Sequence, residues 1–469
     1  MNQTSFSSLG LSPELLDTLS SLGYESMTPI QAQSLPPILA GQDVIAQGKT
    51  GSGKTAAFGL GLLAKLDIAS LRVQSLVLCP TRELADQVAK EIRKLARAVA
   101  NVKVLTLSGG QPYRAQADSL KFGAHIVVGT PGRLEDHLRK KSLDLGAVTI
   151  VVLDEADRML EMGFQESVEA IVAQTPKSRQ TLLFSATYPA EIQAIAKRVM
   201  RQPVTAFAES THDSNTIQQH FYTVADEQQR LTAVRLLLLK YRPGSTVVFC
   251  NTKREAQEIA EDLRSHGFSS LALHGDLDQR DRDQTLVRFS NKSVSVLVAT
   301  DVAARGLDID SLDAVINYHI AHDTEMHVHR IGRTGRAGSK GAAHSLISEK
   351  ESYKVALLQD YLGQAITPEP LPPTSLLNGT PNQPEMETLL IDGGKKQKVR
   401  PGDILGALTG EGGITGAQVG KIDMFDIRAY VAVQRDAVKP ALNKLSEGKL
   451  KGRSFRVRLL RGQPDSARN

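Results

Sequence analysis

One segment of the chain carries a complete G-x-x-x-x-G-K-[ST] pattern, Gly48-Lys49-Thr50-Gly51-Ser52-Gly53-Lys54-Thr55. In such a loop the glycines let backbone N–H groups turn toward phosphates, the lysine meets the β- and γ-phosphate oxygens, and the last hydroxyl binds Mg²⁺. A later segment, Val151-Val152-Leu153-Asp154-Glu155-Ala156-Asp157, is an apolar run that ends in carboxylates. An apolar run of this kind is typical of a buried parallel strand, and ligands bind at the carboxyl ends of such strands. The two segments together predict a site for a nucleoside triphosphate.

The residue types in these segments suggest their roles. We expect Lys54 to supply a positive charge, Thr55 and Asp154 to hold Mg²⁺, and Glu155 to orient and deprotonate the attacking water. A glycine-rich turn or a charged strand end would explain either segment alone, but this explanation is weak for the pair.

Length and composition limit the class of protein. A chain of 469 residues is enough for about three domains. No apolar run approaches the length of a membrane span, and the first residues do not resemble a secretion signal, so we expect a soluble, cytoplasmic protein. The two cysteines, Cys79 and Cys250, lie in apolar runs, which favours buried side chains over redox or zinc-binding roles.

Apolar strand patterns alternate with helical patterns in two successive halves, which predicts two α/β domains with parallel sheets. Residues 75–85 and 246–256 share one plan: a buried strand, a polar turn and a helix start. A proline-rich stretch near residue 370 predicts an extended spacer before a third domain. The predicted boundaries are 1–207, a linker at 208–218, 219–363, a proline-rich linker at 364–384, 385–461 and a tail at 462–469.

The third domain is the basic part of the chain. Residues 379–469 contain 16 Lys and Arg against 10 Asp and Glu, which suggests that this domain binds a polyanion. Its pattern predicts a βαββαβ order, with strands at 388–392, 418–423, 428–433 and 454–460 and helices at 402–409 and 436–446. In the last strand, alternation predicts that Phe455, Val457 and Leu459 share a buried face.

The chain resembles the DEAD-box RNA helicase family, because 154–157 matches the family's namesake tetrad and further motifs follow in the family's order. The resemblance implies two tandem RecA-like domains that use ATP and Mg²⁺. Thr28-Pro29-Ile30-Gln31 is similar to the family motif whose glutamine reads adenine above an aromatic side chain, which implies that Gln31 and Phe6 contact ATP. Most family members have alanine at the position of Gly48.

The other first-half motifs imply contacts with RNA and a link to ATP. Segments 80–85, 109–110 and 130–133 match the family's RNA motifs, and hydroxyls, turn N–H groups and arginines suit phosphates and 2′-OH groups. The implied RNA contacts are Thr81, Arg82, Gly110, Thr130, Gly132 and Arg133. Ser185 and Thr187 match the motif that couples ATP to strand separation by bonding toward the 154–157 turn.

In the second half, segments 279–282, 299–308 and 329–336 are similar to the family's remaining motifs. The resemblance implies that Arg282 and Thr300 contact RNA and that Asp308 contacts the ribose. It also implies that Arg333 and Arg336 are arginine fingers, which reach the γ-phosphate only when the two halves close. His327 and His329 could form a metal pair, but the lack of a nearby cysteine or acidic partner favours a structural role.

The third domain resembles a divergent RNA-recognition motif. Its third strand offers only Tyr430 for base stacking, so we expect RNA contacts from loops and helix edges instead. The candidate residues are Lys395, Lys396, Lys398, Arg400, Lys449, Lys451, Arg453 and Arg456. The full length is similar to a bacterial branch of the family whose C-terminal domain grips a 23S rRNA hairpin. This implies a role on pre-50S particles, with no DNA or membrane partner, for a monomer whose third domain tethers it to that RNA.

Two other functions remain open from sequence alone. The chain could be an ATP-gated RNA clamp whose product is a held complex, although Glu155, Arg333 and Arg336 favour turnover. A Glu155→Gln variant that supports growth and subunit assembly as well as the wild type does would favour the clamp. A DNA translocase with the same two-domain engine is the third possibility, and equal ATPase stimulation by a DNA copy of the target would favour it.

Overall fold

The computed structural model describes residues 5–48, 51–207, 217–304, 312–335 and 341–463. Four predicted site residues, Lys49, Thr50, Asp308 and Arg336, lie outside these ranges. So does most of the linker predicted at 208–218, whose last two residues belong to a strand. The chain divides into two compact units, one containing residues 5–207 and the other residues 217–463, and each is described by itself.

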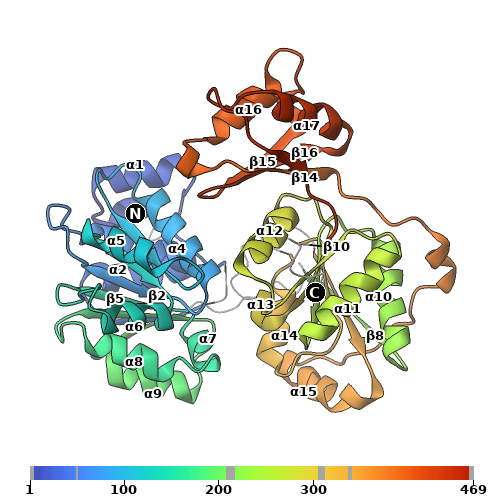
Figure 1. Ribbon diagram of the computed structural model, residues 1–469. Helices are drawn as coiled ribbons and strands as arrows, with labels where there is room; N and C mark the ends of the chain where they lie inside the picture. Colours follow the sequence, from blue (N-terminus) through green and yellow to red (C-terminus); the bar gives the residue numbers. More distant parts are fainter. Residues whose placement is uncertain (1–4, 49–50, 208–216, 305–311, 336–340, 464–469) are drawn as a thin grey trace. The chain divides into compact units, whose positions relative to one another are not determined.

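The first unit is built on a seven-stranded parallel sheet of order β3-β4-β2-β5-β6-β1-β7 (Figure 1). Its strands are β1 (Val44–Gln47), β2 (Ser75–Leu78), β3 (Val104–Leu107), β4 (Ile126–Gly129), β5 (Ile150–Asp154), β6 (Gln180–Ser185) and β7 (Val204–Phe207). Its helices are α1 (Pro13–Ser21), α2 (Pro29–Leu39), α3 (Lys54–Ala64), α4 (Arg82–Leu95), α5 (Tyr113–Lys121), α6 (Pro131–Arg139), α7 (Ala156–Glu161), α8 (Gln165–Ala173) and α9 (Ala190–Val199).

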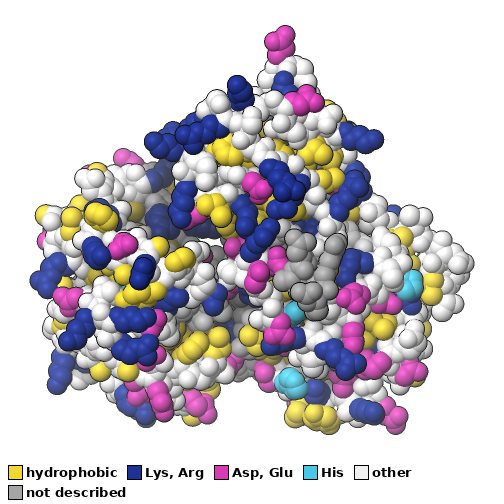
Figure 2. All heavy atoms as spheres, viewed as in Figure 1, with side chains coloured by type: hydrophobic (Ala, Val, Ile, Leu, Met, Phe, Trp, Pro, Cys, Tyr) yellow, Lys and Arg dark blue, Asp and Glu magenta, His cyan; other side chains and the backbone are white. Residues whose placement is uncertain are grey.

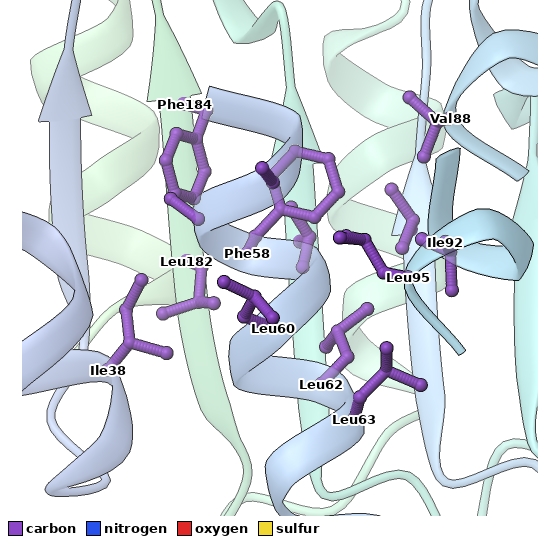
Figure 3. Packing of buried hydrophobic residues seen from close by; sticks show 14 of the residues in the cluster. Ile38, Phe58, Leu60, Leu62, Leu63, Val88, Ile92, Leu95, Leu182 and Phe184 are labelled. Atoms are coloured by element: carbon purple, nitrogen blue, oxygen red, sulfur yellow. The ribbon is translucent and has the colours of Figure 1, made fainter. Parts of the chain in front are cut away.

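Two hydrophobic cores cover the two faces of this sheet. Alternate residues of each strand point to opposite faces, so Val152 of β5 joins the core under α1–α4, whereas Val151 joins the core under α6–α9. Figure 3 shows part of the first core, where Phe58 and Leu60 of α3 lie between Leu182 of the sheet and α4. Because both faces are covered, only the strand ends are left to carry a site.

The second unit repeats this plan with a six-stranded parallel sheet of order β10-β11-β9-β12-β13-β8. The strands are β8 (Ile217–Thr223), β9 (Thr246–Cys250), β10 (Ser270–Leu273), β11 (Val296–Thr300), β12 (Ala314–Asn317) and β13 (Gly341–Ile347). The helices are α10 (Glu227–Tyr241), α11 (Lys253–Ser265), α12 (Gln279–Ser290), α13 (Asp301–Ala304), α14 (Thr324–Ile331) and α15 (Ser352–Leu362). Two parallel-sheet domains are therefore present, as the sequence predicts.

The C-terminal domain is a four-stranded antiparallel sheet of order β15-β16-β14-β17 with two helices. Its elements are β14 (Met386–Ile391), α16 (Pro401–Thr409), β15 (Val419–Met424), β16 (Ala429–Gln434), α17 (Val438–Glu447) and β17 (Val457–Leu459). This order confirms the predicted βαββαβ domain. Phe455, Val457 and Leu459 pack against its core, as the alternation of the last strand predicts.

The proline-rich segment packs along the second unit instead of extending freely. The backbone N–H of Glu369 donates to the Phe221 carbonyl at 2.7 Å, and the Glu369 carboxylate pairs with His220 at 2.7 Å. Leu371 packs against the core under α10 and α11. Further along, Gln383 Nε2 donates to the Gly267 carbonyl at 3.0 Å. These contacts hold the segment against the sheet domain over much of its length.

The C-terminal sheet is also in contact with α12 of the same unit. Leu390 of β14 and Tyr430 of β16, both almost fully buried, form one cluster with Val287 of α12. Beside this cluster the Thr388 hydroxyl accepts from Asn291 Nδ2 at 2.9 Å and bonds with Ser293 Oγ at 2.8 Å. The one aromatic side chain that the sequence offered for base stacking is therefore covered by protein.

Across the described residues, no helix is both long enough and apolar enough to cross a bilayer.

Candidate functional site

The phosphate loop lies between β1 and α3, at the carboxyl end of the first sheet. Gly51 and Gly53 have φ angles of 83° and 93°, in the left-handed region that glycine adopts at little cost. The buried Lys54 ammonium donates to the Gly48 carbonyl, so the lysine folds back over the loop. Six of the eight predicted loop residues are described, and they form a turn that leads directly into the first turn of α3.

Gln31 lies against this loop and bonds to its backbone. Its Nε2 donates to the Gly53 carbonyl at 3.1 Å, and its Oε1 accepts from the Thr28 N–H at 2.9 Å. The Thr28 hydroxyl donates to the Ser52 carbonyl at 2.7 Å. The glutamine predicted to read adenine therefore contacts the phosphate loop directly. Phe6 is 4% exposed and packs edge-on against Tyr24 in the core of this unit.

Asp154 ends β5 as a buried carboxyl group, 3% exposed. Burial, and secondly the charge of Glu155, raise its pKa to about 7 although Lys54 lies near enough to oppose the shift. Glu155 has a φ of 50°, a left-handed conformation that a non-glycine residue adopts only under local constraint. A carboxyl group with a raised pKa lacks sufficient positive charge around it, which is the environment that a bound cation would correct.

The donor atoms here suit magnesium. Thr55 offers a hydroxyl and Asp154 a carboxylate, and Mg²⁺ binds hard oxygen ligands together with water and substrate phosphates. The predicted set of Thr55 and Asp154 therefore fits this metal chemically.

Asp157, which is not among the predicted site residues, makes several hydrogen bonds to residues 185–187. Its Oδ2 accepts from the N–H groups of Ala186 at 3.1 Å and Thr187 at 2.9 Å, and from the Thr187 hydroxyl at 3.1 Å. Its own N–H donates to the Ser185 hydroxyl at 3.3 Å. Burial raises the pKa of Asp157, but these donors and Lys54 outweigh burial and hold it below its usual range. The last letter of the tetrad could have signalled this role.

The three RNA-motif loops of the first unit lie together at the ends of β2, β3 and β4. The Arg82 guanidinium lies against Gly109, where a Cβ atom would come within 3.0 Å of Nη2. Arg133 Nη1 donates to the Gln111 carbonyl at 2.9 Å, just after the Gly109–Gly110 turn. Thr81 caps α4, and its hydroxyl accepts from the Leu84 N–H at 3.2 Å. Thr130 is the cap residue of α6, and Gly132 has open space where a side chain would begin.

In the second unit, the strand ends hold an ion pair in which the arginine is buried and the carboxylate is partly buried. Arg330 Nε and Nη2 bond to the two carboxylate oxygens of Asp301, both at 2.7 Å, and Nη1 donates to the His319 carbonyl at 2.7 Å. This pair joins α14, which precedes Arg333, to the end of β11. Thr300 and Arg333 are both mostly buried, and Arg282 Nη2 donates to the Ala303 carbonyl at 2.9 Å.

The basic residues of the C-terminal domain form one group of loops and one outlier. Lys451 Nζ donates to the Lys398 carbonyl at 2.9 Å and pairs with Asp403 at 3.3 Å, which joins the 395–400 and 448–453 loops beside the start of α16. Lys396 pairs with Asp426 at 3.3 Å. The exposed members of the group are Lys395, Lys396, Lys398, Arg400, Lys449, Lys451 and Arg453. Arg456 is exposed beside β17, and Figure 2 shows Lys and Arg side chains gathered over this domain.

A phosphate loop, an acidic strand end and a coupled Ser-Ala-Thr segment on one sheet, followed by a second sheet with an arginine motif, define a nucleic-acid helicase. The chain belongs to the DEAD/DEAH box helicase family, whose model matches residues 28–195, and the helicase C-terminal domain matches residues 229–338. Residues 388–459 match the DbpA RNA binding domain.

Similar proteins extend this result over the whole length. The chain is 53% identical over 459 residues to the ATP-dependent RNA helicase DbpA of Escherichia coli (strain K12), covering 98% of this chain and 100% of that protein. It is 47% identical over 349 residues to the DEAD-box ATP-dependent RNA helicase CshA of Bacillus cereus, covering 74% of this chain and 66% of that one. These matches confirm the prediction of an RNA-dependent ATPase and helicase with an RNA-binding C-terminal domain.

Solved structures show the same sheet domains. Saccharomyces cerevisiae Dbp5 bound to RNA and ADP BeF3 is 31% identical, covers 78% of this chain and 96% of its own, and has a TM-score of 0.71. Mss116p bound to ssRNA and AMP-PNP is 28% identical, covers 79% of each chain and has a TM-score of 0.70. RecA-like domains, the fold class predicted from sequence, are therefore confirmed.

Proposed function

We propose that this helicase acts on pre-50S particles, where its C-terminal domain grips a hairpin of 23S rRNA and its two sheet domains open a nearby short duplex at the expense of ATP. The observation that carries the proposal is the C-terminal domain itself. Its sheet face is buried against α12, whereas its basic loops beside α16 are exposed. Exposed loops of this charge suit the phosphates of a folded RNA better than they suit stacked single-stranded bases.

The first unit provides the ATP site of the proposal. Gly48–Thr55 cradle the phosphates, Lys54 contacts the β- and γ-phosphates, and Gln31 moves from the loop backbone to adenine when nucleotide binds. Thr55 and Asp154 hold Mg²⁺, which supplies electrostatic stabilisation of the phosphates. Glu155 orients and deprotonates the attacking water. Phe6 contacts the base in this proposal, and because it is only 4% exposed, that contact requires its side chain to move out of the core.

Coupling of ATP to RNA runs through Asp157 in this proposal. The Ser185–Thr187 segment bonds to Asp157, three residues after the proposed metal ligand. A shift of the 154–157 turn on hydrolysis therefore pulls directly on the end of β6. RNA is held by the loops of Thr81, Arg82, Gly110, Thr130, Gly132 and Arg133 in the first unit and by Arg282 and Thr300 in the second.

Arg333 and Arg336 complete the proposal as the groups that stabilise charge on the γ-phosphate, with Asp308 on the ribose. Because these residues belong to the second half of the chain, hydrolysis requires ATP to be bound by both halves during the cycle. ATP and RNA then favour the same state, and each raises the affinity for the other. We further propose the domain boundaries given above, a monomer, and a cytoplasmic location.

Because the proline-rich linker packs on the second unit, the C-terminal domain does more than bring RNA close to the two sheet domains. A free spacer would only raise the local concentration of RNA. Contacts at Glu369, Gln383 and Thr388 instead hold the domain on the second sheet domain. A hairpin gripped by the basic loops therefore has a defined direction relative to Arg282 and Thr300.

The test compares two triple variants, because deleting the C-terminal domain would expose Val287 and damage the second unit. In Lys396→Gln/Lys398→Asn/Lys449→Gln three of the seven exposed loop charges are removed. In the control, Lys177→Gln/Lys197→Gln/Lys439→Gln, the same charge is removed from exposed helices and loops elsewhere. The measurement is the RNA concentration that half-saturates ATPase, for a 23S rRNA fragment with the hairpin and for one with the hairpin scrambled.

We expect the wild type and the control to prefer the intact hairpin, and the loop variant to lose that preference. Loss of two or three phosphate contacts also lowers the salt dependence of RNA binding by about 2 in log–log slope. Equal preference in all three proteins would show that these loops do not select the RNA. Wild-type indifference to the hairpin would remove the rRNA assignment itself.

A further inference from the structure

Gln116 of α5 lies behind the RNA-motif loops and is only 7% exposed. Its Nε2 donates to the Ser108 carbonyl at 2.9 Å, immediately before the Gly109–Gly110 turn. Its Oε1 accepts from Arg133 Nη1 at 2.7 Å. One amide group therefore fixes both the approach to the glycine turn and the guanidinium at the start of α6.

The second acceptor site of Gln116 Oε1 is filled by His137, which is fully buried. His137 Nε2 lies 3.1 Å from Oε1, and its Nδ1 lies 2.8 Å from the Ser142 hydroxyl. Burial, and secondly the positive charge of Arg133, lower the pKa of His137 to about 4, so the ring is neutral at physiological pH. A neutral ring that donates from Nε2 must accept at Nδ1, and the Ser142 hydroxyl can supply that proton.

Tyr113, which lies on α5 with Gln116, completes this hydrogen-bond network by bonding to Ser142. Its hydroxyl lies 2.7 Å from Ser142 Oγ, and its ring stacks on His137 with 4.5 Å between ring centres. Lys140 Nζ lies 4.0 Å above the Tyr113 ring. The amide orientation of Gln116 is therefore determined by partners on every side, and it cannot flip without leaving a buried donor or acceptor unpaired.

The Nε and Nη2 edge of the Arg133 guanidinium is available to a ligand. Its Nη1 is occupied by Gln111 and Gln116, and within the described residues its Nε and Nη2 atoms have no protein partner. A guanidinium held by one nitrogen presents its other two donors in a fixed direction, which suits the two oxygens of a phosphate.

We propose that Gln116 is a positioning residue for RNA binding, which fixes Arg133 and the Gly109–Gly110 turn as one preformed phosphate-binding surface, with His137, Ser142 and Tyr113 holding its amide in place. The inference rests on the proposed function, in which Arg133 contacts RNA. Gln116 itself does not touch the RNA; its contribution is that Arg133 loses less freedom when RNA binds.

The main variant is Gln116→Glu, which keeps the size of the side chain. The carboxylate loses the bond to Ser108 and places a negative charge on Arg133, so less of the guanidinium's charge reaches the RNA. We expect the RNA concentration that half-saturates ATPase to rise about tenfold and the log–log salt slope to fall by about 0.7. The KM for ATP and the rate at saturating RNA stay within about twofold, because the phosphate loop is not touched.

A second variant, Gln116→Met, removes all three bonds without adding charge. Arg133 keeps its charge but not its direction, so we expect a smaller rise in the half-saturating RNA concentration and an unchanged salt slope. The control is Gln193→Glu on the exposed part of α9, which adds the same charge away from these loops. Thermal midpoints of all variants show whether each one is folded.

Arg133→Ala separates this inference from the function on which it rests. If Arg133→Ala leaves RNA saturation unchanged, Arg133 is not an RNA contact and the proposed function loses that residue. If Arg133→Ala weakens RNA binding while folded Gln116→Glu and Gln116→Met behave as wild type, the positioning role is overturned. Because Gln116 acts partly through Arg133, Gln116→Met weakens RNA binding less in the Arg133→Ala background than in the wild type, and the remaining effect reports the Gly109–Gly110 turn.

Discussion

Each parallel sheet places an acidic residue at the carboxyl end of a strand, but the two residues have different surroundings. Asp154 at the end of β5 is buried beside Glu155, and its pKa is raised to about 7 by burial first and by Glu155 second. Asp301, which follows β11, instead has two bonds of 2.7 Å to Arg330. One carboxyl group lacks compensating charge, and the other is fully paired.

This difference fits the role proposed for Asp154 as a metal ligand and a structural role for Asp301. A buried carboxylate without enough positive charge around it costs stability until a cation arrives, which is expected where Mg²⁺ and phosphates bind. A partly buried carboxylate that already has a bidentate arginine stabilises the position of the segments it joins, here the end of β11 and α14. The first sheet thus holds a carboxyl group without enough compensating charge, and the second sheet holds a carboxylate that is paired with an arginine.

The largest effect that we predict concerns Arg333, the proposed arginine finger. In Arg333→Lys the compact ammonium cannot replace a planar guanidinium with several donors. We expect the RNA-stimulated kcat to fall by about 10³-fold or more, with ATP and RNA binding retained. Steady-state ATPase and equilibrium nucleotide binding are the measurements. Turnover equal to that of the wild type would remove Arg333 from catalysis.

The next largest effect is expected when the ion pair between Arg330 and Asp301 is broken. Arg330→Met keeps much of the side-chain volume but leaves the partly buried Asp301 carboxylate without its partner. We expect a loss of about 3–5 kcal/mol in the unfolding free energy of the second unit, measured by urea denaturation. A control at the exposed pair of Arg254 and Glu258, Arg254→Met, costs about 0.5 kcal/mol or less. Similar losses in the two variants would mean that burial of the Asp301 pair is unimportant.

Removing the charge of Asp154 is expected to change the unfolding free energy in the opposite direction. Asp154→Asn removes a poorly compensated buried charge while the side-chain oxygen still accepts from the Glu155 N–H. We expect the first unit to gain about 1–3 kcal/mol in unfolding free energy as ATPase activity is lost. Asp301→Asn is the matched substitution in the other sheet, and there we expect a loss of stability. A decrease in both variants would contradict the contrast between the two carboxyl groups.

Sequence alone predicted the features that depend on local pattern. The buried runs, the glycine turn and the order of the third domain are set by residues close together in the chain, so their periodicity and spacing reveal them. Gln116 was missed because only the fold brings its partners together, whereas Asp157 was missed although the tetrad and the Ser185–Thr187 motif both indicate the 154–157 turn. Tyr430 was recognised as an unconvincing stacking platform, but its cover, Val287, lies in another domain, and no local pattern indicates that contact.

A smaller effect on stability is expected from a buried histidine of the second unit, His344. In the second unit His344 stacks on His220 and lies against the tilted ring of Tyr241. Burial, followed by the charges of His220 and Lys240, lowers the pKa of His344 to about 3. The unfolded chain binds a proton at this histidine below about pH 6.5, whereas the folded chain does not until near pH 3. The contribution of neutral His344 to stability is therefore present above pH 6.5 and declines as the pH falls.

His344→Phe removes this proton uptake and keeps the ring stacking. We expect the fall in unfolding free energy between pH 7 and pH 5.5 to be smaller than in the wild type by about 1 kcal/mol. Urea denaturation at both pH values measures it. An identical pH dependence in the two proteins would show that His344 titrates normally in the folded state.

The smallest predicted effect concerns Gly48 of the phosphate loop, which we compare with Gly53 of the same loop. A Cβ atom at Gly48 would come within 3.1 Å of Ser52 Oγ, a hydroxyl that can rotate away, so Gly48→Ala should change stability by less than about 0.5 kcal/mol and KM for ATP by less than about twofold. At Gly53 the φ of 93° and a Cβ position 2.5 Å from Gln31 Nε2 predict a marked loss of ATP binding in Gly53→Ala. Equal losses would mean that the whole loop is intolerant of side chains, and that backbone freedom is needed at Gly48 as well.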